Sequence, residues 1–128
     1  MTTRRSLAAG LAVLALGGTA WANGRPPRTD DVMFRPGQPD HIAIAATFGL
    51  MLSEDAGATW RWMCEEAIGY NGTYDPDYGY TASGAVFATL FGGMRVMRDG
   101  CAFELTSLGT AQIAEIAVGP DGTILALS

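Results

Sequence analysis

Short apolar segments, separated by glycine and aspartate, follow one another along most of this chain. They read IAIAAT (42–47), WRWMC (60–64), AVFATL (85–90), MRVM (94–97), AQIAEIAV (111–118) and ILALS (124–128). Segments of this length between turn residues are typical of β-strands. Glycine or proline interrupts nearly every stretch long enough for a helix, so the sequence predicts an all-β fold.

These segments recur with a period of 43 residues. A shift of 43 places glycine on glycine and aromatic on aromatic, matching Phe48-Gly49 with Phe91-Gly92, Gly57 with Gly100, and Trp60 with Phe103. The segment that we take to open each unit occurs three times, as PDHIAIAAT, SGAVFATL and DGTILALS. A period of this length indicates stacked copies of one supersecondary unit.

The motif SxDxGxTW, at residues 53–60, lies between the expected second and third strands of the first unit and predicts a hairpin turn. Ser53 and Asp55 carry short acceptors for turn amides, and Gly57 permits a positive φ. Thr59 re-enters the strand, and Trp60 supplies a large apolar anchor.

This motif resembles the Asp-box, the bacterial neuraminidase repeat of sialidases and other extracellular β-propellers. The resemblance implies a partial β-propeller of four-stranded antiparallel blades, with each Asp-box on an outer hairpin, away from the central channel. It therefore implies a structural role for the motif. The second copy, 97–103, is degenerate because Arg98 stands where the motif has aspartate and Asp99 is displaced by one residue.

The resemblance covers residues 32–128 as about two and a half blades, whereas a closed propeller has roughly four to eight. We expect one blade at 32–70, a second at 71–108 and an incomplete third at 109–128. Three alternatives stay open: several chains that complete a ring, a fragment or descendant of a longer propeller, and a small open sheet with covered edges.

The first 22 residues have the anatomy of a secretory signal peptide. A charged start precedes an apolar run at 7–18 and the small-residue stretch TAWA, which predicts cleavage after Ala22. The run spans roughly 18 Å, too short for a stable membrane anchor. We expect a periplasmic or extracellular protein that begins at Asn23 with a proline-rich lead-in over 23–31. Because Arg4 and Arg5 fit both signal types, general secretion and twin-arginine export both remain open.

The charge of the chain disfavours nucleic acid as a partner. Eight arginines and no lysine stand against thirteen acids, for a net charge of −5. A surface that binds phosphate backbones needs the opposite balance.

Residues 70–80 form the candidate binding surface, because they hold all four tyrosines and two close aspartates: Tyr70, Tyr74, Asp75, Asp77, Tyr78 and Tyr80. Aromatic faces stack on sugars, and the carboxylates are suitable calcium ligands, although the spacing is not that of an EF-hand. The alternative is a long loop between blades whose tyrosines cover the sheet.

Cys64 and Cys101 are the only cysteines, and an even pair in an exported protein predicts one disulfide. Apart from calcium, we expect no cofactor. We also expect no metal site built from histidine or cysteine, since His41 is the sole histidine. If the ring is open, Trp62 or Met63 forms an apolar patch that invites a partner.

Catalysis is not expected. The resemblance implies that a sialidase needs three arginines around a carboxylate, a tyrosine activated by glutamate, and an acidic donor. No arginine stands in such a context, and Glu65 and Glu66 have no evident tyrosine partner. We expect a non-enzymatic binding or assembly module for a protein or carbohydrate. The alternatives are a remnant of a sialidase-like hydrolase and a product without selected function.

Overall fold

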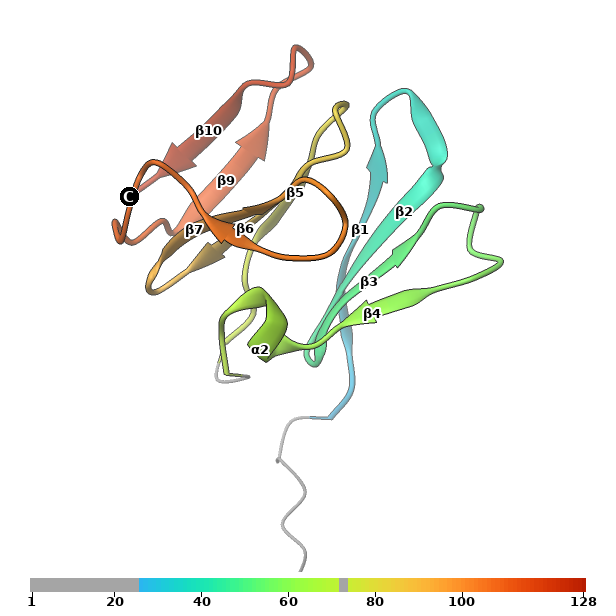
Figure 1. Ribbon diagram of the computed structural model, residues 1–128, viewed down its shortest axis with the longest axis horizontal. Helices are drawn as coiled ribbons and strands as arrows, with labels where there is room; N and C mark the ends of the chain where they lie inside the picture. Colours follow the sequence, from blue (N-terminus) through green and yellow to red (C-terminus); the bar gives the residue numbers. More distant parts are fainter. Residues whose placement is uncertain (1–25, 72–73) are drawn as a thin grey trace, which may run out of the picture.

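The structure is a computed structural model that describes residues 26–71 and 74–128. The expected signal peptide lies outside the described residues, as do residues 23–25 of the lead-in. Two four-stranded antiparallel sheets and a two-stranded hairpin stand side by side (Figure 1). The protein is therefore all-β, and its sheets do not close on themselves.

The first sheet has the order β1-β2-β3-β4. Its strands are β1 (Thr29–Arg35), β2 (Gln38–Ala46), β3 (Gly49–Ser53) and β4 (Arg61–Met63). One helical turn, α2 (Glu65–Ile68), follows β4 and ends at Gly69, whose φ of 110° is left-handed. In the part of the chain that the structure describes, no helix is long and apolar enough to cross a membrane.

The second sheet repeats this order as β5-β6-β7-β8, and the hairpin β9–β10 follows it. The strands are β5 (Tyr78–Tyr80), β6 (Val86–Leu90), β7 (Gly93–Met97), β8 (Glu104–Leu105), β9 (Glu115–Val118) and β10 (Ile124–Leu127). β1 contacts β5, and β5 contacts β9. The three units are therefore joined along their first strands.

The main core fills the space between the two four-stranded sheets. Small side chains of β2 and β6 lie at its centre, and larger apolar side chains surround them: Ala43, Ala45, Leu50, Leu52, Met63, Ile68, Tyr78, Val86, Ala88 and Leu90. A second, smaller cluster joins the other face of the second sheet to the hairpin through Met94, Ile113 and Ile116. Both faces of the second sheet are thus covered.

The segments expected to open each unit are in fact its second strands. β1 lies before β2 in the first sheet, β5 before β6 in the second, and β9 before β10 in the hairpin. The expected lead-in is also too long, because β1 begins at Thr29 and pairs with β2 along its length. Prolines and aspartates around β1 hide its apolar alternation, and Pro36 lies in the turn that follows it.

The third strands of the two sheets, β3 and β7, are separated by one residue more than the period of 43. Gly49 begins β3 and Gly93 begins β7, with φ angles of 123° and 111°. A Cβ added to either would lie 2.1 Å from a carbonyl oxygen, whereas one added to Gly92 meets nothing within 4 Å. Gly49 therefore corresponds to Gly93, not to Gly92. A shift of one residue moves side chains to the opposite face of a strand, so the spacing matters.

We expect Gly49→Ala to destabilise the protein by more than about 1 kcal/mol, because the methyl group meets the Met63 carbonyl and the backbone is left-handed. Gly92→Ala is the matched control and changes the free energy of unfolding by no more than about 0.5 kcal/mol. Urea unfolding followed by circular dichroism measures both. Equal losses in the two variants would contradict the corrected correspondence.

Candidate functional site

Side chains of the turn over residues 53–60 hold it in shape. The buried Ser53 hydroxyl donates to Asp55 Oδ1 at 2.8 Å and accepts the Gly57 N–H at 2.8 Å. Asp55 in turn accepts the Thr59 N–H at 2.8 Å and the Thr59 hydroxyl at 2.6 Å. Trp60 folds over the turn, where its Nε1 donates to the Gly57 carbonyl at 2.9 Å. The polar groups of this motif thus bond to one another.

The equivalent turn of the second sheet is one residue shorter but uses an aspartate in the same way. Asp99 Oδ1 accepts the N–H groups of Cys101 and Ala102, at 2.9 and 3.4 Å. Like Gly57, Gly100 has a positive φ, 76° against 88°. Asp99 is therefore the counterpart of Asp55, and its apparent displacement comes from the shorter turn.

These bonds make both carboxyl groups more acidic. The Thr59 hydroxyl and the Thr59 amide, in that order, hold the pKa of Asp55 below its ordinary value. The amides of Cys101 and Ala102 lower the pKa of Asp99 likewise. Each carboxylate therefore stabilises the fold above the ordinary carboxyl pKa, and this contribution is lost as pH falls through the lowered value.

We expect Asp55→Ala to lower the melting temperature at about pH 7. We expect the difference in melting temperature from the wild type to narrow as pH falls toward about 2, because protonation of Asp55 removes the contribution of its carboxylate. Glu54→Ala is the control, since Glu54 is the exposed neighbour in the same turn. Thermal unfolding at the two pH values measures the effect. A gap that does not change with pH would contradict it.

The tyrosines expected to form a binding surface lie largely in or against the core. Tyr70 and Tyr78 are buried, and Tyr74 and Tyr80 are half-buried and pack against them. Burial raises the pKa of Tyr78 well above its ordinary value, so its phenol stays protonated. Tyr74 also packs on Phe91, with ring centroids 4.2 Å apart. Stacking on a sugar would require these rings to leave the packing between the sheets.

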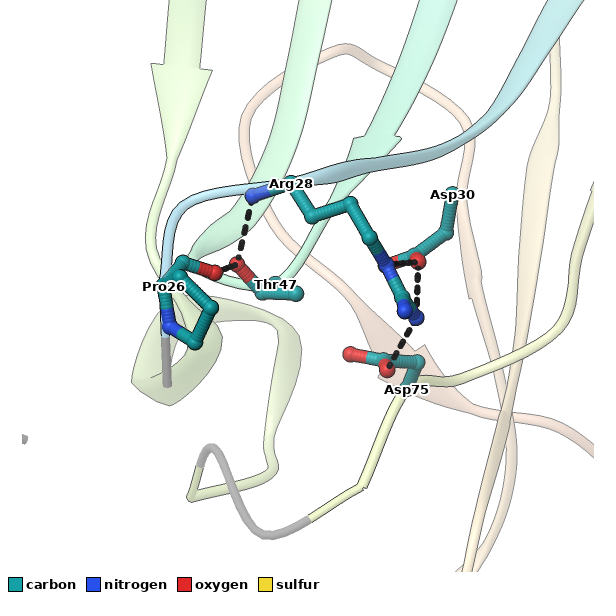
Figure 2. Close-up of polar contacts among 5 residues, drawn as sticks. All are labelled: Pro26, Arg28, Asp30, Thr47 and Asp75. Carbon is teal, nitrogen blue, oxygen red and sulfur yellow. Dashed lines mark hydrogen bonds and ion pairs between the residues drawn. The ribbon is translucent and has the colours of Figure 1, made fainter. Parts of the chain in front are cut away.

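The two aspartates of the expected calcium loop contact protein groups. Asp75 forms an ion pair with Arg28 at 3.9 Å, and Arg28 also pairs with Asp30 at 2.6 Å (Figure 2). Asp77 Oδ2 accepts the Ile116 N–H at 2.8 Å, which ties β5 to β9. Over residues 26–71 and 74–128, no group of three histidine, cysteine, aspartate or glutamate side chains is placed to hold a metal ion.

Thr47 fixes the start of the first strand. Its hydroxyl accepts the Arg28 N–H at 3.1 Å and donates to the Pro26 carbonyl at 3.2 Å (Figure 2). Its own N–H donates to the Arg28 carbonyl at 3.0 Å. The residues before β1 are thereby bound to the end of β2.

Cys64 and Cys101 are free thiols in the structure, which differs from the disulfide expected from the sequence. Cys64 lies between β4 and α2, and Cys101 lies in the turn between β7 and β8. Both line one hollow, together with Met63 and Ala67. The structure thus places the two thiols on a shared surface, and their oxidation stays a prediction.

We expect the protein isolated under oxidising conditions to show no reactive thiol when denatured, and two after reduction, because both cysteines line the same hollow. Thiol titration in denaturant measures this. Cys64→Ser is the control and exposes one thiol without reductant. Two reactive thiols in the unreduced wild-type protein would contradict the disulfide.

The outer face of the first sheet, which points away from the second sheet, carries a continuous apolar row. Across the ladder, Val32 pairs with Ile44, Ile44 with Met51, and Met51 with Trp62. Directly paired residues project to the same face, so these four side chains lie in line. Phe34 and Ile42 extend the row. We call this set, with all six residues, the outer face of the first sheet.

Three of these large apolar side chains are exposed, and the other three, Ile42, Ile44 and Met51, are half-buried. The exposed fraction is 60% for Trp62, 57% for Phe34 and 46% for Val32. The Trp62 indole is nevertheless held in place, because its Nε1 donates to the Phe48 carbonyl at 3.0 Å and the Phe48 ring meets its edge. The sequence pointed to Trp62 or Met63, of which Met63 is buried in the core. It missed Val32 and Phe34, because β1, the strand that holds them, was not among the expected apolar segments.

The outer face of the hairpin is largely apolar as well: it is formed by Ala117, Leu125 and Leu127, with Glu115 opposite Leu127. Leu125 pairs with Ala117, and these residues alternate with Ile116 and Ile124, which pack toward the second sheet. Leu125 is 64% exposed and Leu127 is 62% exposed. Apolar faces therefore lie at both ends of the described stack of sheets. Exposed apolar surface of this kind marks sites of association.

Comparisons with known proteins do not add a family to this geometry. A scan against family models, a search of curated proteins and a search of solved structures each found no match to the chain. The function must be argued from the two outer faces and the groups between the sheets.

Proposed function

We propose that the protein is an exported, non-enzymatic assembly module whose sheets are blades of a β-propeller-type fold. Its outer faces are contact surfaces for further copies of the same chain. The observation that carries the proposal is the row Val32–Ile44–Met51–Trp62, which crosses four strands with its two ends exposed and its two central residues half-buried. Such an apolar row is costly in water unless another surface covers it.

The packing inside the chain supports one geometry for this contact. The second sheet presents one face to the first sheet and the other face to the hairpin, so it is covered on both sides. The outer face of the first sheet and that of the hairpin are the two positions in this series without a neighbour among the described residues. The same packing between chains joins the hairpin of one copy to the first sheet of the next. Such head-to-tail contacts are heterologous and close into rings when the rotation fits.

The open edge of the hairpin also favours association. Over residues 26–71 and 74–128, β10 pairs only with β9, whereas the corresponding strands β2 and β6 have ladder partners on both sides. An edge strand that exposes Leu125 and Leu127 is a liability unless another surface covers it. A second copy docked on this face shields both side chains.

Export and partner chemistry are parts of the same proposal. The signal peptide at 1–22 delivers the chain to a compartment where the Cys64–Cys101 pair oxidises. The negative net charge disfavours nucleic acid and anionic lipid. A foreign protein or a carbohydrate is the alternative occupant of the outer faces. Calcium is an alternative ligand of Asp75 and Asp77, where it would have to displace Arg28 and the Ile116 amide.

The alternative of a sialidase-like hydrolase has less support. Glu65 and Glu66 form the first turn of α2, and Tyr70, the tyrosine nearest them in sequence, is buried in the core. A phenol in that position lacks access to substrate. Turnover of a fluorogenic sialoside that disappears in Glu65→Gln or Glu66→Gln would favour the hydrolase over the assembly module.

We expect the purified protein to form oligomers that Trp62→Glu and Leu125→Glu each disrupt, because a buried, unpaired carboxylate opposes association. Light scattering on a size-exclusion column measures the mass. Mixing the two variants restores a dimer, since each retains the face that the other has lost. Leu108→Glu is the control at a similarly exposed leucine outside both faces.

The mixing experiment separates the possible arrangements. Face-to-face pairing through the first sheet would leave Leu125→Glu associated and Trp62→Glu alone monomeric. A wild-type protein that stays monomeric and folded at high concentration would exclude self-assembly and leave a foreign partner as the occupant.

A further inference from the structure

The hollow that both cysteines line has a volume of about 480 Å³ and lies between β4, α2 and the turn that joins β7 to β8. Three residues that contain sulfur line it: Met63 at the end of β4, Cys64 directly after β4, and Cys101 in the turn. The other lining residues are Arg61, Trp62, Ala67 and Gly100. The fold thus brings the only two cysteines of the chain to one place from two different sheets.

The main chain around both cysteines is held in place. The Cys64 carbonyl accepts two N–H groups of α2, at 3.0 and 3.2 Å. The Cys101 N–H donates to Asp99 Oδ1 at 2.9 Å. Arg61 of β4 packs against the same turn, since a Cβ added to Gly100 would lie 2.9 Å from its NH2. Both thiols are therefore kept beside the hollow although no bond joins them.

The donor atoms at this hollow favour one class of metal ion. Structural zinc sites need about four sulfur, nitrogen or oxygen ligands. Within residues 26–71 and 74–128, no group of three histidine, cysteine, aspartate or glutamate side chains is placed to hold a metal ion, which disfavours zinc. Thiolate and thioether sulfur atoms are soft ligands that select Cu(I). This monovalent ion needs only about two or three such ligands, and no histidine.

We propose that Cys64 and Cys101 bind one Cu(I) ion as thiolates, with Met63 as a third soft side chain at the site. Each thiol loses its proton to solvent when the ion binds. Two thiolates around Cu(I) carry a single net negative charge, and the positive charge of Arg61, which lines the same hollow, stabilises it. Cys101 is exposed, so the ion has access to the site from solvent.

The metal site and the disulfide are two states of the same pair of cysteines. A disulfide holds its sulfur atoms about 2.05 Å apart, whereas an ion bound between two sulfur atoms lets them stay farther apart. A disulfide offers no thiolate, so oxidation of the pair removes the site. The inference goes beyond self-assembly, because the site lies within one chain.

Anaerobic titration of the full purified protein, reduced beforehand, tests the proposal with Cu(I) as the probe. Ascorbate keeps the copper monovalent, and the coloured complex of Cu(I) with bicinchoninate reports how much copper the protein removes. We expect one Cu(I) per chain and binding of Zn(II) that is at least about 1,000-fold weaker. Cys64→Ser and Cys101→Ser each weaken Cu(I) binding by at least about 100-fold, because each replaces a soft thiolate with a neutral hydroxyl.

Glu65→Gln is the matched control, because Glu65 follows Cys64 in the chain but is not part of the lining of the hollow. This variant should bind Cu(I) like the wild type. Wild-type protein treated with oxidised glutathione, which converts the two thiols to the disulfide, should not bind it. Circular dichroism spectra and melting temperatures confirm that the variants are folded, and light scattering shows that their oligomeric state is unchanged.

Three results would overturn the proposal. The first is a reduced wild-type protein that leaves all the copper with bicinchoninate. The second is wild-type affinity in both folded variants, Cys64→Ser and Cys101→Ser. The third is half an ion per chain, because the ion would then join thiols of two copies instead of the two cysteines of one chain.

Discussion

The close approach of the first two sheets is the contact on which the other features of the molecule depend. Ala43 of β2 and Ala88 of β6 are fully buried in the core between these sheets. Side chains this small at the centre let two backbones approach, and the larger residues around them then fill the remaining space. This packing places one face of the first sheet inside and leaves Val32, Phe34 and Trp62 outside. It also brings the turns of both sheets together around a cavity lined by Arg35, Arg61 and Arg98.

The sequence predicted the class of the fold because local signals determine it. Short apolar segments between turn residues became strands, and the acceptors expected at Ser53 and Asp55 do bond to turn amides. β1 was missed, since its pairing depends on a neighbour strand and its own residues include two aspartates. The glycine match was wrong by one position because only a clash with a distant carbonyl distinguishes Gly93 from Gly92. The cavity could not be predicted at all, for Arg35, Arg61 and Arg98 come from three separate elements.

Apolar and polar interactions occupy different parts of this molecule. The outer faces offer aliphatic and aromatic side chains with few polar groups, which suits a partner that packs against them and excludes water. The cavity between the sheets is lined mainly by charged and polar side chains, among them Arg35, Arg61 and Glu54. Arg35 of β1 donates to the Ala82 carbonyl in the turn between β5 and β6, so a direct hydrogen bond joins the two sheets at this cavity.

The shorter turn after β7 shows how such a repeat tolerates the loss of a residue. Asp99 still accepts two turn amides although the spacing from the preceding strand to the turn glycine has shrunk by one. A side-chain acceptor in a turn can reach amides at several positions, whereas the hydrogen bonds between two strands fix their register. A deletion in the turn therefore leaves the strands unchanged, while a deletion within a strand moves each following side chain to the opposite face of the sheet. Copies of this unit can therefore diverge in length at their turns while their faces stay in phase. A pattern with fixed spacing would overlook such copies, and matching the strands and the turn aspartate separately would recover them.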